Sequence, residues 1–311
     1  MENVDSCDLC GSKWWRLFEE YERYGQTFTF VECLDCGLAF LTPRPTVEEM
    51  PRYYDEAYNV RHGIFGESQF KSLLVSLLKR ILKIRYEGTI FESTLVRLFF
   101  SPLELKWRKF LRRNHLESIQ HIGRVLDVGC GRGAWLASMR RLDFDCYGCE
   151  PNLKAAEIAQ SMGLSVACSD LPGAKYPNDY FDVVRFMSVL EHVHNPTMVL
   201  LETKRVLKPG GLVIIDVPNH AGITAQAFRH SEDVPRHLYS YSPETLRRYF
   251  EKVGLRVVSI KTQTVNPHTI YGYLGARGIE MLKGTGTPKE VARAENFWSA
   301  RNRKRQSEFR A

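Results

Sequence analysis

The sequence predicts an α/β protein built on a doubly wound, Rossmann-like parallel sheet, preceded by a small cysteine-rich module and a helical insertion. Three observations carry this prediction. A short apolar strand ends in a glycine-rich turn at residues 124–133, strand and helix patterns then alternate up to residue 217, and two Cys-x-x-Cys-Gly repeats occupy the first 37 residues. Alternating strands and helices are typical of a parallel sheet that carries helices on its faces.

Length and composition indicate a globular chain of roughly two domains. The chain has 311 residues, of which 44% are hydrophobic and 25% charged, and this excludes a disordered or fibrous protein. The sequence has no run of about 18 apolar residues, and its first residues do not resemble a secretory signal. We therefore expect a cytoplasmic protein.

The charge of the chain is concentrated in two segments. Residues 71–113 carry +8 (11 Lys and Arg against three Glu) and residues 289–310 carry +4, within a total of +7. The rest of the chain is therefore mildly acidic, at −5. A uniformly basic nucleic-acid binder is not indicated by this distribution.

Four cysteines near the N-terminus predict a metal site. Cys7 and Cys10, and then Cys33 and Cys36, form two knuckles separated by 22 residues, and residues 27–33 between them alternate like a β-strand. Disulfides are not expected to persist in the cytosol, whereas two such knuckles can hold one zinc ion through four thiolates. The sequence therefore predicts a structural zinc ribbon over residues 1–45.

Residues 46–120 read as a helical connector or cap that is basic and amphipathic. Residues 46–54 predict a short helix capped by Thr46, and leucines and isoleucines recur at helical spacing among basic residues from residue 71 onward. We favour a cap packed on the following domain. The second interpretation is a peripheral contact of residues 71–113 with the anionic inner face of a membrane. Nucleic-acid binding is less favoured than either the cap or the membrane contact.

The stretch from residue 121 to about residue 283 predicts a cofactor-binding domain. After the first strand, further strands are expected at residues 144–149, 164–167, 181–186 and 212–217, with a helix at 196–207 and a turn at 208–211. Asp127 precedes the glycine turn, where a negative charge would oppose a pyrophosphate and favour a cationic ligand. Glu150, 17 residues beyond Gly133, is suited to accept hydrogen bonds from a ribose.

These motifs resemble those of class I S-adenosylmethionine-dependent methyltransferases. The resemblance covers residues 124–260 and rests on VLDVGCGRG, CEPN, SDLP, VLEHV and LKPGGLVIIDVPN. Within that superfamily the chain is similar to the ubiquinone-biosynthesis and small-molecule branch. Its front end, CDLCG followed by CLDCGLAFLTPRP, resembles a bacterial subgroup associated with sugar and cell-surface glycan modification. The resemblance implies a seven-stranded sheet and S-adenosyl-L-methionine as the cofactor.

The resemblance also implies which residues hold that cofactor. The turn would lie beside the methionine part and Asp127 beneath it, Glu150 would hold the ribose, Asp170 and Leu171 the adenine, and residues 186–188 would line the wall near the sulfonium. The full expected set is Asp127, Gly129, Cys130, Gly131, Gly133, Glu150, Pro151, Ser169, Asp170, Leu171, Phe186, Met187 and Ser188. A third Cys-x-x-Cys, Cys146 and Cys149, lies on a strand and is expected to be buried rather than metal-binding.

Two histidines are candidates for removing a proton from the methyl acceptor. His192 follows the fourth strand, and His237 lies in a loop after the fifth, so both are expected near the cofactor. The segment around His237 resembles a Glu-His-Leu-x-Tyr-Ser segment of sugar C-methyltransferases, but Arg236 stands at the Glu position. This departure favours methylation of a hydroxyl over methylation of carbon, and Arg236 is instead suited to meet a substrate phosphate or carboxylate.

The predicted activity is methylation of a sugar hydroxyl in cell-surface polysaccharide or natural-product biosynthesis. Sugar C-methylation, RNA methylation that uses the zinc ribbon and basic segments, and a binding module without catalysis are the alternatives. The segment after the fourth strand lacks the Asn-Pro-Pro-aromatic motif, which disfavours DNA amine methylation. Residues 284–311 read as a basic helix or tail.

Overall fold

The structure, a computed structural model, describes residues 1–54, 123–141, 144–221 and 233–260. These residues form two compact units. The antiparallel unit comprises residues 1–54, 190–200, 217–221 and 233–260, and the parallel unit comprises residues 123–141, 144–189 and 201–216. The basic segment 71–113, the tail 284–311 and a strand pair expected after residue 260 lie outside the described residues. None of the described helices is long and apolar enough to cross a membrane.

The parallel unit contains the doubly wound sheet that the sequence predicts. Its five strands run in the order β6-β5-β4-β7-β8, and all neighbours are parallel. The strands are β4 (Arg124–Val128), β5 (Asp145–Cys149), β6 (Ser165–Ala167), β7 (Phe181–Met187) and β8 (Leu207–Asp216). The chain leaves β4 toward one edge and returns at β7 toward the other. Such a change of direction leaves a crevice for a ligand at the carboxyl ends of β4 and β7.

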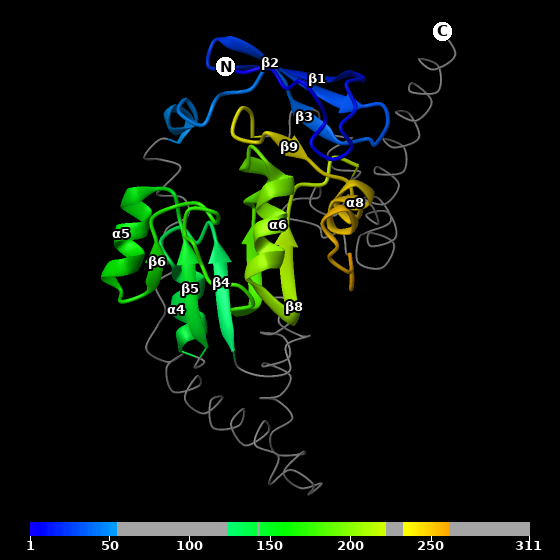
Figure 1. The fold of residues 1–311 in the computed structure, drawn as a ribbon. Helices are drawn as coiled ribbons and strands as arrows, with labels where there is room; N and C mark the ends of the chain where they lie inside the picture. The colour runs from blue at the N-terminus through cyan, green and yellow to red at the C-terminus, as the bar shows by residue number, and fades with distance from the viewer. Residues whose placement is uncertain (55–122, 142–143, 222–232, 261–311) are drawn as a thin grey trace, which may run out of the picture. The chain divides into compact units, whose positions relative to one another are not determined.

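Two helices cover the strands β4 to β6 and bury their apolar faces. They are α4 (Ala134–Arg140) and α5 (Leu153–Ser161), drawn in green beside the sheet in Figure 1. Leu136 and Met139 of α4 and Ala156 and Ala159 of α5 are fully buried. The small alanine side chains let α5 approach the sheet closely, and Asn152 caps this helix by accepting from the amide of Ala155 at 3.0 Å.

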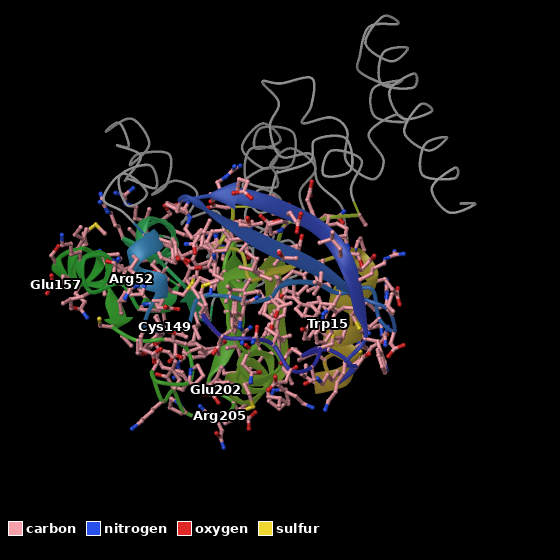
Figure 2. The ribbon with its side chains drawn as sticks, turned by 90° about the horizontal axis from the view of Figure 1, so that it is seen from above. Trp15, Arg52, Cys149, Glu157, Glu202 and Arg205 are labelled. Atoms are coloured by element: carbon pink, nitrogen blue, oxygen red, sulfur yellow. The ribbon has the colours of Figure 1, made fainter. Side chains whose placement is uncertain are left out.

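The boundary between the helix α6 (Pro196–Val206) and the strand β8 differs from the sequence prediction. The predicted turn at residues 208–211 lies inside β8, whose pairing with β7 shifts register near Val183. The residues predicted to form a turn instead form a bulge within β8, in which Gly210 has a φ of +80°. In the last turn of α6, Glu202 and Arg205 form an ion pair at 2.5 Å, and Figure 2 shows them close together.

The antiparallel unit holds a four-stranded sheet in the order β1-β2-β3-β9. Its strands are β1 (Trp15–Arg23), β2 (Gln26–Cys33), β3 (Ala39–Leu41) and β9 (Tyr239–Ser240). One face is aromatic, because Tyr21, Phe28 and Phe30 are at most 1% exposed, and Phe40, which pairs with Val31, is equally buried on the opposite face. The strand β9 pairs with β3 although some 200 residues separate them, so the loop of His237 belongs to the same compact unit as the cysteine knuckles.

The helix predicted at residues 46–54 is shorter than expected. A turn at Thr46 leads into a single 3₁₀ turn, η1 (Met50–Tyr53), and Glu49 accepts from the amide of Thr46 at 3.0 Å. Pro51 lacks an amide proton and cannot donate to the preceding turn, which limits the helix to this length. In contrast, α8 (Pro243–Val253) begins where the sequence predicts, at a capping box formed by Ser242 and Thr245.

Candidate functional site

The three glycines of the turn after β4 serve different purposes. Gly129, Gly131 and Gly133 have φ values of +66°, +53° and +77°, a region that side chains disfavour. A Cβ atom at Gly129 would lie 2.6 Å from Val189, and one at Gly133 would lie 2.4 Å from Leu164, so both are needed for packing. A Cβ atom at Gly131 would meet nothing within 4 Å. Gly131 is therefore where a ligand can approach the backbone.

Glu150 directly follows β5 and is hydrogen-bonded to this turn. Its Oε2 atom accepts from the amide of Gly131 and its Oε1 atom from the amide of Asn152, both at 2.9 Å. Burial raises the pKa of Glu150, and the two amide donors work in the opposite direction. The structure thus brings the predicted ribose-binding carboxylate to the predicted glycine turn.

Ser169, Asp170 and Leu171 follow β6 at the same edge of the sheet. The paired residues Val128, Cys149 and Ala167 end β4, β5 and β6 side by side, so the segments that follow these strands emerge together. Asp170 accepts from the amide of Gly173 at 2.8 Å, and the hydroxyl of Ser169 donates to the carbonyl of Asp170 at 3.0 Å. Leu171 is 1% exposed.

The charge of Asp127 is paired with that of Arg185, which the sequence-based interpretation did not include. Its Oδ1 atom accepts from Arg185 at 2.7 Å, and the Arg185 guanidinium lies 4.5 Å from the centre of the Trp135 ring. Burial raises the pKa of Asp127, and Arg185 opposes that rise by stabilising the charged form. The negative charge that we expected to favour a cationic ligand is therefore balanced inside the sheet. Sequence reasoning missed Arg185, although a charged residue in the middle of an apolar strand is a visible signal.

The remaining expected cofactor residues vary in exposure. Phe186 is fully buried, Cys130 is 8% exposed, and Pro151 is exposed. Met187 is half-buried, and Ser188 is exposed with φ +53° while its amide donates to the carbonyl of Asp216 at 3.0 Å. Phe186 therefore contributes to the core of the sheet.

Cys146 and Cys149 are buried, as the sequence predicts. They are 8% and 0% exposed, and burial raises the pKa of each thiol to about 12. Both thiols are therefore protonated at neutral pH, which suits small apolar residues of a core rather than metal ligands.

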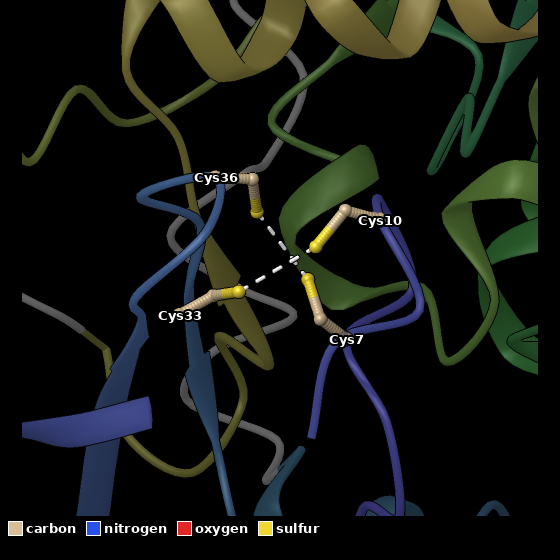
Figure 3. Close-up of side chains that lie close together, drawn as sticks. All are labelled: Cys7, Cys10, Cys33 and Cys36. Atoms are coloured by element: carbon tan, nitrogen blue, oxygen red, sulfur yellow. Dashed lines mark hydrogen bonds between the residues drawn. The ribbon is translucent and has the colours of Figure 1, made fainter. Parts of the chain in front are cut away.

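The four N-terminal cysteines converge, as Figure 3 shows. The sulfur atoms of Cys7 and Cys36 are 3.5 Å apart, as are those of Cys10 and Cys33, and all four lie within 4.8 Å of one another. Four sulfurs at about 2.3 Å from a zinc ion would be about 3.8 Å apart, so the cluster fits a tetrahedral site. A hydrogen bond from Cys36, together with backbone amides, lowers the pKa of Cys7 to about 6.

Glu191, His192 and His237 form a second cluster, within the antiparallel unit. One ligand atom of each lies within 4.8 Å of the others, and the two imidazole rings are 4.9 Å apart at 69°. Glu191 and His192 belong to the 3₁₀ turn η2 (Leu190–His192), and the amide of Leu238 donates to the carbonyl of Glu191 at 2.7 Å. The structure thus brings together two histidines predicted separately, and adds Glu191, which sequence reasoning did not select.

Hydrogen bonds assign the tautomer of His192. Its Nδ1 atom lies 2.8 Å from the carbonyl oxygen of Arg236 and 3.2 Å from the hydroxyl of Tyr54. Because a carbonyl only accepts, Nδ1 carries the proton and Nε2 keeps its lone pair, 4.0 Å from a carboxylate oxygen of Glu191. Burial, and then the nearby His237, lower the pKa of His192 to about 4. The ring is therefore neutral at pH 7.

Arg236 is occupied by partners within the antiparallel unit. It forms an ion pair with Asp233 at 2.5 Å and donates to the carbonyl of Tyr53 at 2.9 Å. The backbone carbonyl of the same residue fixes His192. These contacts indicate a role in holding the histidine loop rather than the substrate contact that we expected.

Comparisons with known proteins identify the family of the chain. A family model described as "Methyltransferase domain" matches residues 97–260. The chain is 32% identical to a ubiquinone biosynthesis O-methyltransferase of Azoarcus sp. (strain BH72), over 47% of this chain and 70% of that protein. It is also 32% identical to one of Albidiferax ferrireducens, over 54% of this chain and 71% of that protein. A SAM-dependent methyltransferase structure from Archaeoglobus fulgidus matches with a TM-score of 0.43 and 21% identity, over 60% of this chain and 92% of that one.

Proposed function

The chain belongs to the S-adenosylmethionine-dependent methyltransferase family, and from this premise we propose that it methylates a hydroxyl group of a sugar, in a small molecule or glycan. Methyl transfer follows from the family. The hydroxyl acceptor is supported by the relatives, which are O-methyltransferases, and by the histidine cluster, which carries the proposal. The sugar is supported by the resemblance of the cysteine-rich front end to glycan-modifying proteins.

The residues at the carboxyl edge of the parallel sheet would hold the cofactor. When bound, S-adenosylmethionine supplies an electrophilic methyl group. Gly131 leaves room for close approach, and Glu150 would accept hydrogen bonds from the ribose while it keeps the turn in place. The proposed set remains Asp127, Gly129, Cys130, Gly131, Gly133, Glu150, Pro151, Ser169, Asp170, Leu171, Phe186, Met187 and Ser188.

A hydroxyl is a poor nucleophile until its proton is removed, and the histidine cluster is suited to that task. His192 presents a lone pair at Nε2, but the burial that lowers its pKa to about 4 also makes it a weak base, so it needs a nearby negative charge to accept a proton. Proton transfer to this atom would create an imidazolium beside Glu191, whose carboxylate stabilises a positive charge at 4.0 Å. In this proposal His192 accepts the proton and His237, in ring contact with it, orients the acceptor hydroxyl or shares that proton.

We also propose that Cys7, Cys10, Cys33 and Cys36 hold one structural zinc ion. Four thiolates complete a tetrahedron, so no position remains for a reacting water. Metal analysis of the purified protein should find one zinc per chain, and a Cys33→Ser variant should lose it.

Cofactor binding is tested first, by calorimetric titration with S-adenosylmethionine and separately with NADH. We expect binding of the first ligand alone. The substitution Glu150→Gln should weaken that binding at least tenfold, about 1.4 kcal/mol. A glutamine side chain lacks the negative charge of the carboxylate and one of its two acceptor oxygens. Glu157→Gln is the matched control, since Glu157 is exposed on α5 (Figure 2). Equal affinities of the two variants would contradict the assignment of Glu150.

The acceptor is tested with S-adenosylmethionine labelled in its methyl group. Nucleotide sugars, isolated glycans and RNA serve as separate acceptors, and NMR of the product identifies the methylated atom. The proposal expects label on a sugar oxygen. Label on a sugar carbon, or on RNA alone, would overturn it.

A further inference from the structure

Asp8, in the first cysteine knuckle, joins three segments that are far apart in the sequence. It lies between Cys7 and Cys10, the expected metal ligands. Its Oδ2 atom accepts from the hydroxyl of Thr197 at 2.7 Å, from the amide of Thr197 at 3.1 Å, and from the hydroxyl of Tyr249 at 2.9 Å. The Asp8 carbonyl accepts from Thr197 at 3.2 Å and from Lys252. Lys252 also donates to the Thr197 hydroxyl at 3.0 Å.

These contacts place a negative charge at the beginning of α6. Thr197 is the second residue of that helix, and amides in a first turn have no carbonyl partner within the helix. Asn195 satisfies one of them by accepting from Met198 at 3.0 Å, and Asp8 satisfies that of Thr197. A carboxylate here also interacts favourably with the helix dipole. Asp8 therefore caps α6 from a different part of the chain.

The beginning of α6 is continuous with the histidine turn. We define the histidine turn as residues 190–194, which Asn195 links to α6. Its other end is held by the segment around β9, because the hydroxyl of Tyr241 donates to Leu190 at 3.0 Å. Arg44 donates to the carbonyl of His194 at 3.0 Å, and the ring of His194 donates to Pro45 at 2.9 Å. Asp8 adds a fixed point at Thr197, beyond the contacts that Arg44 and Pro45 make with His194.

The position of Asp8 depends in turn on the knuckle. The turn closes through the amide of Gly11, which donates to Cys7 at 2.7 Å, and through the amide of Cys7, which donates to Ser12 at 2.8 Å. A metal bound by Cys7 and Cys10 fixes the residue directly before Asp8 and the second residue after it. Without a metal, Cys7 and Cys10 lose the bonds that would hold them to one ion, and the knuckle relaxes.

We propose that Asp8 is a positioning residue that couples metal occupancy of the four-cysteine cluster to the order of the histidine turn. The inference rests on the proposed zinc site but not on the identity of the acceptor. Metal loss would free Asp8, remove the external cap of α6 and loosen the turn that carries His192.

Hydrogen–deuterium exchange of residues 190–198 in the full-length protein, with zinc bound and after chelation, tests the coupling. In the wild type, removal of zinc should speed exchange of these amides at least tenfold. Asp8→Ala should exchange as fast with zinc bound, and chelation should then add less than twofold. A residue that is merely structural would give additive effects, whereas a coupled residue gives effects that do not add.

Two further variants complete the experiment. Asp35 also lies between the two cysteines of its knuckle, one position later than Asp8 does, and it is exposed, so Asp35→Ala should keep the wild-type response to zinc. Thr197→Val removes one donor to Asp8 and should give an intermediate effect even where Asp8→Ala fails to fold. Wild-type protection in zinc-loaded Asp8→Ala or Thr197→Val, or a full additional response to chelation in either, would overturn the proposal. Failure of the wild type to bind Zn²⁺ at all would overturn both this proposal and the zinc assignment, whereas neither result bears on methyl transfer.

Discussion

Asp127 and Arg185 face each other across β4 and β7, and their pairing shows how one residue changes the electrostatics of a site. A buried carboxylate that loses its partner is left with an uncompensated charge. Arg185→Met should therefore lower the free energy of unfolding by about 3 kcal/mol or more, measured with urea. Lys208→Met, which breaks a more exposed pair with Asp182, should lower it by less than about 1 kcal/mol. Similar losses in the two variants would show that Asp127 is not charged in the wild type.

His192 gives a second prediction at the residue scale. Its pKa, about 4 in the folded protein, lies below the ordinary value of 6.5, so the unfolded chain binds more protons between these values. Stability should therefore be complete above pH 6.5 and fall by roughly 3 kcal/mol as the pH drops toward 4. In His192→Gln this part of the pH dependence should disappear from urea titrations. An unchanged slope would mean that His192 is not buried in a neutral form.

The residue types at the candidate site could be predicted from the sequence, but their hydrogen-bond and ion-pair partners could not. The glycines, Glu150 and the four cysteines are recognisable because each type suits a special backbone angle or ligand at a fixed spacing. The Asp127–Arg185 pair, the contact of Glu150 with Gly131, and the network around Asp8 depend on register between strands and on segments up to about 240 residues apart. Local patterns do not encode such distances.

In the glycine turn, the effect of a substitution on stability can be separated from its effect on cofactor binding. Gly133→Ala would force a side chain against Leu164 and Ala159 in a left-handed conformation, so stability should fall by about 2 kcal/mol or more. Gly131→Ala meets only the backbone penalty of about 1–2 kcal/mol, because the space around it is open. Its main effect should be at least tenfold weaker binding of S-adenosylmethionine. Urea unfolding and calorimetry distinguish the two, and a reversed pattern would mean that Gly133 is the ligand-facing position.

Element boundaries differ from the sequence prediction where the chain bends. The strands β4, β5, β6 and β7 lie within one residue of their predicted ends, since apolar runs bounded by turn residues are unambiguous. The strand β8 instead continues through the lysine, proline and glycine pattern at residues 208–211, because its pairing with β7 absorbs a bulge. The strand β9 has only two residues, too few to show any alternation, so its pairing with β3 was not predictable.

At the scale of the whole molecule, the two units should respond differently to metal removal. Chelation of zinc should increase hydrogen exchange in β1, β2 and β3 of the antiparallel unit, because the knuckles at their ends lose their cross-link. Affinity for S-adenosylmethionine should change less than threefold, since the expected cofactor residues all belong to the parallel unit. Exchange and calorimetry on the same chelated sample measure both. A large loss of affinity would show that zinc acts on the cofactor residues as well.

The pairing of β3 with β9 also bears on how the protein is made. A chain that emerges from the ribosome in order exposes every described strand of the parallel sheet once Asp216 has appeared. The cysteine knuckles emerge before the parallel sheet, yet their own sheet lacks its last strand until Ser240 follows, and Tyr249, which binds Asp8, comes later still. The cysteine-rich sheet can therefore be completed only after every described strand of the parallel sheet has emerged.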